Sequence, residues 1–482
     1  MDPVFEFPIT LPPRDARGLL QALHAQLRGA ILDGRLGPGL RLPSTRKLAD
    51  AYAISRNTAV AAYDLLLSEG YVVARQGAGV FVAAALPRRP ESKAATSNAA
   101  SERRLVAHWR DPPAPFAPAP VPTPELAFAL GIPDGALFPF ALWRRLTTRA
   151  LRTLAKSRAS YGTPRGQAAL REGIARHVSF ARAVACAADD IVVTGGAQQA
   201  FDLLARILVT PGRTVVAIEN PGYPPLRAAL AAAGAQIAPV RVDAEGLVVE
   251  RIPREARVVC VSPSHQFPLG CAMSARRRAA LLDFAQARGA VVIEDDYDGE
   301  FRFGGRPLDA LQTLDRGESV FYVGTFSKSL FPAIRLGYVV APSWALNALI
   351  AAKREADWHS PIIEQETLAA FIGEGHMARH VRRMRGIYAA RREALLAGLR
   401  AFSRWIEPIP SVAGLHLSAY ANDSVDAAAL ADIARQNDVG VSPIRNFYFG
   451  TPARQGLAFG YGAIDERSIV EACARLARAW PA

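Results

Sequence analysis

The chain has 482 residues, half of them hydrophobic, which is more than one ordinary domain needs and enough to bury a large core. Its formal net charge of +13 would suit a polyanionic partner, but residues 1–86 carry nine Lys or Arg against seven Asp or Glu. The bulk charge therefore does not locate a nucleic-acid site.

The cysteines exclude two classes of small scaffold. The four of them are scattered without a CxxC pair, which argues against both a disulfide framework and a structural zinc site.

The opening MDPVFEFPITLPPRD lacks the basic and apolar regions of a signal peptide, and apolar stretches elsewhere are short or broken by Gly and Pro. We therefore expect a cytoplasmic protein that neither is exported nor spans a membrane.

Residues 14–85 carry the pattern of a small helical domain with a hairpin. HAQLRGAILDG, STRKLADAY and SRNTAVAAYDLLLSEG have helical spacing, and YVVA and VFVA flank the turn QGAG. Three helices followed by a β-hairpin is the element order of a winged helix-turn-helix.

Two serines mark helix starts in this domain. Ser44 and Ser55 each offer an N-cap hydroxyl, and the helix after Ser55 presents Arg56, Asn57 and Thr58 in its first turn. In a helix-turn-helix the start of the second helix reaches base edges, while neighbouring basic groups contact phosphates. Taken one at a time, these residues also suit an ordinary solvated helix face.

The combination resembles the GntR family of winged-helix regulators. The LPS turn, the Arg-Lys-Leu-Ala helix, the Ser-Arg-Asn-Thr helix and the Gly-x-Gly wing are all present over residues 14–84. The resemblance implies double-stranded operator DNA as a partner. The DNA contacts that it implies are Arg46, Ser55, Arg56, Asn57 and Thr58, with Gln76 and Gly77 on the wing in the minor groove.

Residues 86–124 mix Pro, Ala, Ser and charge without a period, which predicts a flexible linker. Beyond it, in residues 125–482, short β-branched runs alternate with longer Ala- and Leu-rich helical segments. This alternation predicts an α/β domain with a mostly parallel sheet. From about residue 375, a long Arg-rich helical stretch and further short strands predict a smaller α+β subdomain.

The segment YVGTFSKSLFPAIRLGYVV places Lys328 after a strand, among hydroxyls and ahead of Arg335. A lysine among apolar neighbours loses part of its preference for charge and becomes a free amine that can attack an aldehyde. The hydroxyls of Thr325 and Ser327, together with Arg335, suit a phosphate dianion. By itself the segment could also be a surface loop with an exposed lysine.

Other predicted strands end in side chains that suit the same ligand. Asp295 follows one strand and could hold a pyridine nitrogen protonated, and Tyr297 could hydrogen-bond a ring oxygen. The Gly196 turn offers an anion site at a helix start, and Tyr223 could stack on a flat ring. His265 and Gln266 are further donors. In open α/β sheets ligands bind at the carboxyl ends of strands, so these residues can meet.

This order resembles fold-type I aminotransferases over residues 125–480. The resemblance implies pyridoxal 5'-phosphate as cofactor, with Lys328 as its Schiff-base lysine, Asp295 on the ring nitrogen, Tyr297 on the ring hydroxyl and Tyr223 stacked on the ring. The residues it implies around the phosphate are Gly196, Ala197, Gln198, Thr325, Ser327 and Arg335. Tyr161 matches the residue that these proteins lend to the neighbouring subunit's phosphate, which implies a homodimer.

The two halves together, with PSHQFPLG, EDDYD and GTFSKSL, resemble the MocR branch of GntR regulators. That resemblance implies a regulator that senses an amino compound or vitamin B6 through the cofactor, without efficient turnover. Two alternatives stay open: a working aminotransferase with an appended DNA-binding domain, and a vestigial site that binds no cofactor.

The late strand GLAFGYGAI has Leu457 and Ala458 where aminotransferases usually carry an arginine for the substrate carboxylate. Arg445 and Arg454 are nearby candidates for holding an effector. His376 and His380 have the i, i+4 spacing of a helical metal pair, but no third ligand accompanies them, so we expect no metal site.

Overall fold

The computed structural model describes residues 4–12, 18–84, 104, 106–110, 124–158, 160–304 and 308–480. The chain divides into two units, Met1–Asp111 and Pro112–Ala482, with separate cores. Most of the predicted linker 86–124 lies outside the described residues, as do residues 14–17 of the predicted first domain.

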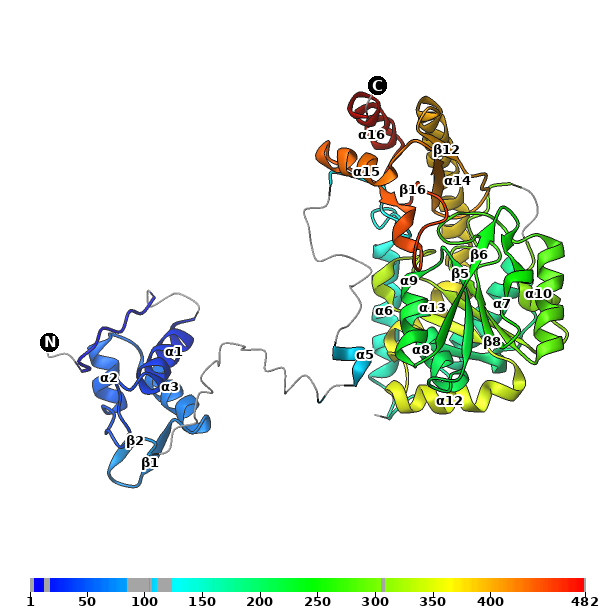
Figure 1. The fold of residues 1–482 in the computed structure, drawn as a ribbon. Helices are drawn as coiled ribbons and strands as arrows, with labels where there is room; N and C mark the ends of the chain where they lie inside the picture. The colour runs from blue at the N-terminus through cyan, green and yellow to red at the C-terminus, as the bar shows by residue number, and fades with distance from the viewer. Residues whose placement is uncertain are drawn as a thin grey trace. The chain divides into compact units, whose positions relative to one another are not determined.

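The N-terminal unit has the predicted order of three helices and a hairpin. Its elements are α1 (Leu19–Leu32), α2 (Thr45–Ala51), α3 (Arg56–Ser68), β1 (Val72–Arg75) and β2 (Gly79–Val82) (Figure 1). One core joins the helices, because α1 buries Leu23 and Leu27 while α3 buries Ala59 and Leu66 at helical spacing. β1 and β2 pair antiparallel around a turn with Gly77 at φ 72°, which glycine adopts without strain. The winged helix-turn-helix prediction is confirmed.

An eight-stranded sheet forms the centre of the C-terminal unit, in the order β4-β11-β10-β9-β8-β5-β6-β7. Its strands are β4 (Ile191–Thr194), β5 (Val215–Asn220), β6 (Gln236–Asp243), β7 (Gly246–Leu247), β8 (Ala256–Val261), β9 (Val291–Asp296), β10 (Val320–Thr325) and β11 (Gly337–Val340). Only β7 and β11 run antiparallel to their neighbours in this sheet, so the prediction of a mostly parallel sheet is confirmed.

Helices cover both faces of this sheet (Figure 1). They are α6 (Phe140–Leu154), α7 (Ala168–Arg182), α8 (Ala197–Leu208), α9 (Pro224–Ala232), α10 (Ala275–Arg288), α11 (Leu311–Leu314), α12 (Ser343–Asp357) and α13 (Ile362–Gly373). Every residue of β4, β10 and β11 is buried, because helices pack on both sides of them.

A smaller subdomain follows, as predicted. The long helix α14 (His376–Leu399) leads into a second sheet of order β12-β13-β16-β15, with helices α15 (Ala427–Gln436) and α16 (Glu466–Ala479). Its strands are β12 (Ile406–Pro408), β13 (His416–Ala421), β15 (Ser442–Pro443) and β16 (Gly456–Gly460). The short strands β3 (Leu126–Ala127) and β14 (Val439–Gly440) pair in parallel and tie the start of the unit to this subdomain.

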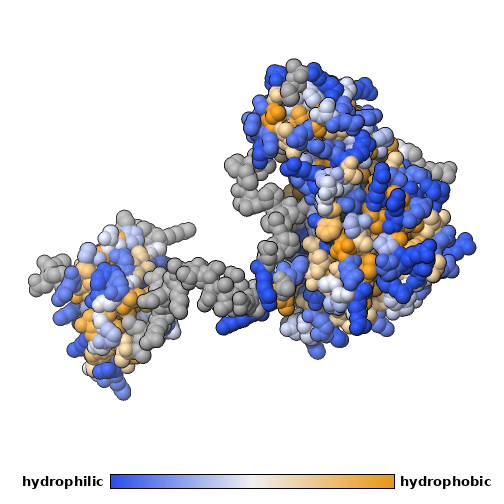
Figure 2. Space-filling model, viewed as in Figure 1, coloured by the Kyte–Doolittle hydropathy of each residue, from blue (hydrophilic) through white to orange (hydrophobic). Residues whose placement is uncertain are grey.

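The face of the C-terminal unit in Figure 2 mixes hydrophilic and hydrophobic residues. Among the described residues, no helix is long and apolar enough to cross a membrane.

Candidate functional site

The carboxyl ends of β4, β5, β8, β9 and β10 lie at the same edge of the central sheet. β10 is parallel to β9 with Gly324 beside Asp296, and β9 is parallel to β8 with Glu294 beside Val261. β4 joins them through the antiparallel β11, whose Gly337 pairs with both Thr194 and Thr325. The segments that follow these strands therefore meet, as the sequence predicted.

Lys328 lies in the loop between β10 and the short helix η3 (Pro332–Ile334). Burial lowers its pKa, and the carboxylates of Asp298 and Asp295 partly offset that effect. Gly131 passes close by, since a Cβ on it would lie 2.9 Å from the Lys328 Nζ. The lysine is therefore a partly buried amine beside the Gly131 backbone, and it needs less free energy than an exposed lysine to lose its proton.

Asp295 lies within β9, one residue before the strand ends at Asp296, and not just past the strand as the sequence predicted. The side chain is 4% exposed, and its Oδ1 is buried without a hydrogen-bond partner. Burial raises the pKa of this carboxyl to about 8, with a further contribution from Asp296. A buried carboxylate without a partner is costly, so the site favours a cationic or N–H group beside Asp295.

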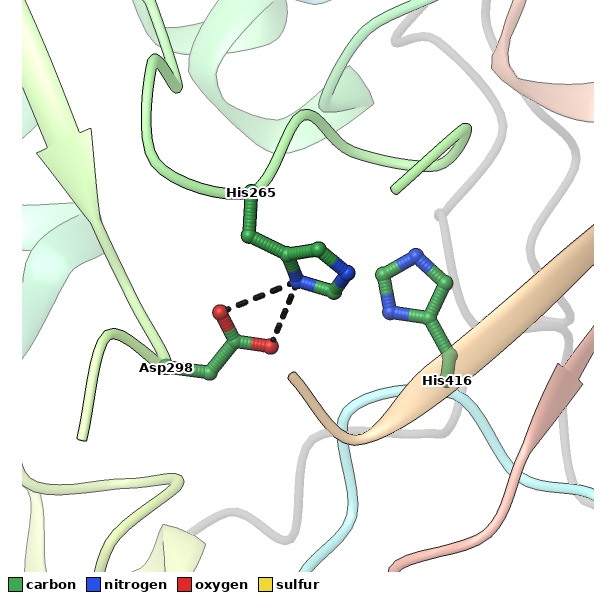
Figure 3. Close-up of side chains that lie close together, drawn as sticks. All are labelled: His265, Asp298 and His416. Atoms are coloured by element: carbon green, nitrogen blue, oxygen red, sulfur yellow. Dashed lines mark hydrogen bonds and ion pairs between the residues drawn. The ribbon is translucent and has the colours of Figure 1, made fainter. Parts of the chain in front are cut away.

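Tyr297 and His265 contact each other. The Tyr297 hydroxyl donates to the backbone oxygen of His265 at 3.0 Å and lies 3.0 Å from the His265 Nδ1. The imidazole is 2% exposed and also bonds both oxygens of Asp298. The His265 ring therefore has the Asp298 carboxylate (Figure 3) and the Tyr297 hydroxyl as partners within the protein, whereas the sequence analysis suggested it as a hydrogen-bond donor to a ligand.

The Gly195–Gly196 turn joins β4 to α8. Gly196 has φ 89°, and a Cβ on it would lie 2.9 Å from the Nη2 of Arg335, which donates to the Gly195 oxygen at 2.8 Å. Gln199 accepts from the Gly195 N–H at 2.7 Å and donates to Asp357 at 2.7 Å. The turn is therefore held from two sides at the positive end of a helix, which suits an anion.

The remaining predicted phosphate residues include one that lies next to this turn, because Thr325 pairs with Gly337, on which a Cβ would lie 2.9 Å from the Gly196 Cα. Thr325 and Ser327 are 7% exposed, and their hydroxyls lie 3.1 Å apart. Ala197 and Gln198 open α8, with the Gln198 amide donating to the Pro225 oxygen at 3.1 Å.

Two aromatic residues differ sharply in burial. Tyr223 is a partly buried residue at the position just before α9, and its ring packs edge-on to Phe267, with ring centroids 5.6 Å apart. Tyr161 is 77% exposed and lies against Trp358 at 4.9 Å. It lines a groove of about 370 Å³ between α6 and α13.

The two effector candidates lie in different surroundings. Arg445 is exposed in the short helix η5 (Ile444–Phe447). Arg454 stacks on Tyr420, its Cζ 3.7 Å from the ring centroid, and lines a cavity of about 310 Å³ with Arg241 and Tyr448.

Sequence reasoning missed several residues of this site. Asp298 lies in the same EDDYDGEF segment that drew attention to Asp295, so spacing could have found it. His416 comes from β13, more than a hundred residues away, and carries no local signal. With His265 and Asp298 it forms the one buried His and carboxylate cluster with metal-ligand geometry among the described residues. His376 and His380 have separate partners instead, Glu374 and Phe138.

In the N-terminal unit, the predicted DNA residues gather at α2, α3 and the wing. Arg46, Arg56, Asn57, Gln76 and Gly77 are exposed. The Ser55 hydroxyl accepts from the Thr58 N–H at 3.0 Å and lies 2.7 Å from its hydroxyl. The Ser55 hydroxyl therefore caps α3 and the Thr58 hydroxyl contacts it, whereas Arg56 and Asn57 are exposed and free to meet a base edge.

Comparison with known proteins agrees with both halves. Residues 19–82 match the bacterial regulatory proteins of the gntR family, and residues 126–476 match aminotransferase class I and II. The probable rhizopine catabolism regulatory protein MocR of Rhizobium meliloti is 35% identical, over 93% of this chain and 91% of its own. The HTH-type transcriptional regulator TauR of Rhodobacter capsulatus is 34% identical, over 97% and 98%.

The C-terminal unit is also similar to solved aminotransferases. LysN, the alpha-aminoadipate aminotransferase of Thermus thermophilus, is 29% identical with a TM-score of 0.67, and the match covers 73% of this chain and 91% of that one. An aminotransferase class I and II domain implies pyridoxal 5'-phosphate as its cofactor. The residues present fit this group: the unpartnered Asp295 Oδ1 suits a pyridine N–H, and the Gly196 turn leaves room where a Cβ would collide with Arg335.

A GntR-type winged helix-turn-helix implies DNA binding, and whole-length regulators share both halves in the same order. The chain therefore belongs to the MocR-type branch of the GntR family, the pyridoxal phosphate-dependent transcription regulators with an aminotransferase-like domain.

Proposed function

We propose that Lys328 carries pyridoxal phosphate covalently and that an amino compound, or a vitamin B6 species, acts there to change how the N-terminal unit engages operator DNA. The observation that carries this proposal is the partly buried Lys328 amine, with its lowered pKa, beside the unpartnered carboxylate of Asp295. Bound pyridoxal phosphate supplies an aldehyde that condenses with primary amines, so an effector amine can replace the lysine amine.

Each neighbouring residue has a distinct task in this proposal. Asp295 binds the ring nitrogen, because burial leaves its carboxylate in need of a cationic partner. Tyr223 packs on the ring, and Tyr297 binds the ring oxygen. The Gly196 turn, Arg335, Thr325 and Ser327 receive the phosphate, where N–H groups, hydroxyls and a guanidinium converge.

Peptide mapping tests the attachment. Borohydride reduction of the purified protein should fix the cofactor on the peptide that contains Lys328, and Lys328→Ala should abolish both this adduct and the visible absorption band. Lys156→Ala is the matched control, because Lys156 is exposed on the surface. An unchanged spectrum in Lys328→Ala would contradict the proposal.

The effector site is proposed at the cavity of Arg454. Its wall residues Leu269 and Cys271 belong to the apolar cluster on which Tyr223 and Tyr297 pack, so a ligand there would lie against the same cluster as these two cofactor residues. A guanidinium in such a cavity suits an effector carboxylate. Arg454→Ala should raise the effector concentration needed to change DNA affinity by tenfold or more, whereas the exposed Arg445→Ala should leave it within twofold.

A homodimer is the proposed assembly. Its support is the exposed Tyr161, with the apolar Leu151 and Leu154 at 46% and 39% exposure on the neighbouring helix α6. Light scattering should give the mass of two chains. A monomeric mass at micromolar concentration, with cofactor bound, would contradict this assembly.

The same protein also tests for catalytic turnover. Efficient consumption of an amino donor and a keto acid, unchanged by deletion of residues 1–86, would overturn the regulatory proposal in favour of an enzyme with an appended DNA-binding domain.

A further inference from the structure

Lys353 is a lysine whose whole side chain is buried, on the helix α12 that packs against α8. The side chain is 0% exposed. Its Nζ donates to both oxygens of Asp357, one helical turn later, at 2.5 and 2.6 Å, and to the Ser360 hydroxyl at 3.3 Å. An ammonium has three N–H groups, so each of them has an acceptor and the buried charge is fully paired.

Asp357 links this ion pair to the turn at the start of α8 through one side chain. The Nε2 of Gln199 donates to the Asp357 Oδ2 at 2.7 Å, and the Oε1 of Gln199 accepts from the Gly195 N–H at 2.7 Å. An amide suits both contacts, because it has a donor on one atom and an acceptor on the other. A chain of hydrogen bonds therefore runs from the Lys353 ammonium to the backbone of Gly195.

Gly195 is held at both of its backbone groups. Gln199 accepts from its N–H, and the Arg335 Nη2 donates to its carbonyl oxygen at 2.8 Å. The neighbouring Gly196 has no room to move toward Arg335, since a Cβ on it would already lie 2.9 Å from that guanidinium. The first N–H groups of a helix have no acceptor within the helix, so the direction in which those of α8 point depends on this turn.

Lys353 also bridges the tight turn that follows α12. The His359 N–H donates to the Asp357 carbonyl oxygen at 2.7 Å across Trp358, whose φ of 64° and ψ of −65° belong to the strained form of the γ-turn. The lysine bonds side chains on both sides of Trp358, those of Asp357 and Ser360. Holding this turn alone would be a purely structural role for Lys353.

We propose that Lys353 and Asp357 are positioning residues for the cofactor phosphate. They hold the amide of Gln199, and Gln199 holds the Gly195 peptide so that the first N–H groups of α8 face the anion. Without the ammonium, the Asp357 side chain, which is 35% exposed, turns toward water and releases Gln199. The inference rests on the phosphate site proposed at the Gly196 turn and adds the residues that keep this turn in shape.

The test compares two aldehydes that differ only in the phosphate, pyridoxal phosphate and pyridoxal. Each is titrated into full-length cofactor-free protein and followed by its visible absorption. Lys353→Met keeps an unbranched side chain at the buried position and removes the ammonium. It should weaken the binding of pyridoxal phosphate about tenfold and change that of pyridoxal less than about twofold, because pyridoxal has no phosphate for the turn to bind.

A second substitution tests whether the lysine acts through the amide. Gln199→Met should cause the same selective loss, and Lys353→Met/Gln199→Met should lose no more than either single variant, because both changes break one chain. Should Lys353→Met fail to fold, Lys353→Met/Asp357→Ala removes both charges of the pair and breaks the same link. Lys156→Met is the matched control, since Lys156 is exposed, and it should change neither titration.

Equal losses for the two aldehydes in Lys353→Met would overturn the proposal in favour of a purely structural role at the Trp358 turn. Losses that multiply in Lys353→Met/Gln199→Met, or an unchanged affinity for pyridoxal phosphate in Lys353→Met, would also overturn it. Unsubstituted protein that binds pyridoxal as tightly as pyridoxal phosphate would instead contradict the proposed phosphate site, and this inference with it.

Discussion

At the scale of single residues, the site is unusual for its concentration of buried carboxyls. Burial raises the pKa of Asp295 and Glu219 to about 8 and that of Glu294 to about 7. Asp295 and Glu294 are adjacent in β9. Glu219 lies near the end of β5, which is two strands away from β9 in the sheet. Without a ligand these groups favour their protonated forms, and a cationic ring nitrogen beside Asp295 would change that balance.

The stability of cofactor-free protein should therefore fall as pH rises. A carboxyl whose pKa is raised on folding stabilises the native state fully below its unfolded value near 4, and this contribution is lost as pH rises through the folded value. Between pH 5 and pH 8 we expect a falling melting temperature by calorimetry, and Asp295→Asn should flatten that slope. A slope that is the same in the variant would show that Asp295 is ionised without its ligand.

Gly131 offers a second residue-scale test. Its φ is 66°, and a Cβ would lie 2.9 Å from the Lys328 Nζ, so Gly131→Ala should displace the amine and lower the yield of covalent cofactor tenfold or more. Gly135→Ala is the matched control, since a Cβ there meets nothing within 4 Å. The cofactor content of both variants can be read from visible absorbance after dialysis, and equal content would contradict the assignment.

At the scale of elements, neighbouring residues at the start of α3 have different roles, because one stabilises the helix and the next is exposed for DNA recognition. The Ser55 hydroxyl caps the helix, whereas Arg56 is exposed. Sequence reasoning placed both among the DNA contacts, because spacing alone cannot say which hydroxyl is already occupied by the backbone.

Substitution of Ser55 and substitution of Arg56 should therefore have different effects on stability and on DNA binding. Loss of an N-cap costs about 1 kcal/mol, so Ser55→Ala should lower the thermal stability of the N-terminal unit, and Ser44→Ala should have a similar effect because Ser44 caps α2 in the same way. Arg56→Ala should leave the melting temperature unchanged and weaken operator binding by about 1 to 3 kcal/mol, measured by fluorescence anisotropy. Normal operator affinity in Arg56→Ala would show that α3 is not the recognition helix.

At the scale of the whole molecule, the chain has two units with separate cores. The N-terminal unit carries the exposed basic residues of α2 and α3, and the C-terminal unit carries Lys328 and its neighbours. Each unit should keep its own binding chemistry when the other is removed.

Deletion of residues 1–86 tests this separation. The shortened chain should bind pyridoxal phosphate with an unchanged visible spectrum and should lose operator binding entirely. The full chain should lose DNA affinity steeply as salt rises, because its contacts include phosphates. A shortened chain without the visible band would show that the cofactor site depends on the N-terminal unit.

The sequence by itself determined the two fold classes and the main chemical residues of the sheet edge. Periodicity and turn chemistry are local, so the three helices, the hairpin and six strands of the central sheet could be predicted from consecutive residues. The strand β6 was missed, because Gln236–Asp243 contains a proline and is only partly buried at an outer position of the sheet. The parallel sheet then brings the ends of its strands together, which is why Lys328 and Asp295 could be grouped before any coordinates.

Only the tertiary structure decided the surroundings of those residues. It placed the His265 ring against Asp298, brought His416 from the small subdomain, and placed Gly131 against Lys328. The physical reason is that burial and hydrogen-bond partners depend on elements distant in sequence. Proton positions in the site follow from those partners, so they could not be predicted from residue types and spacing.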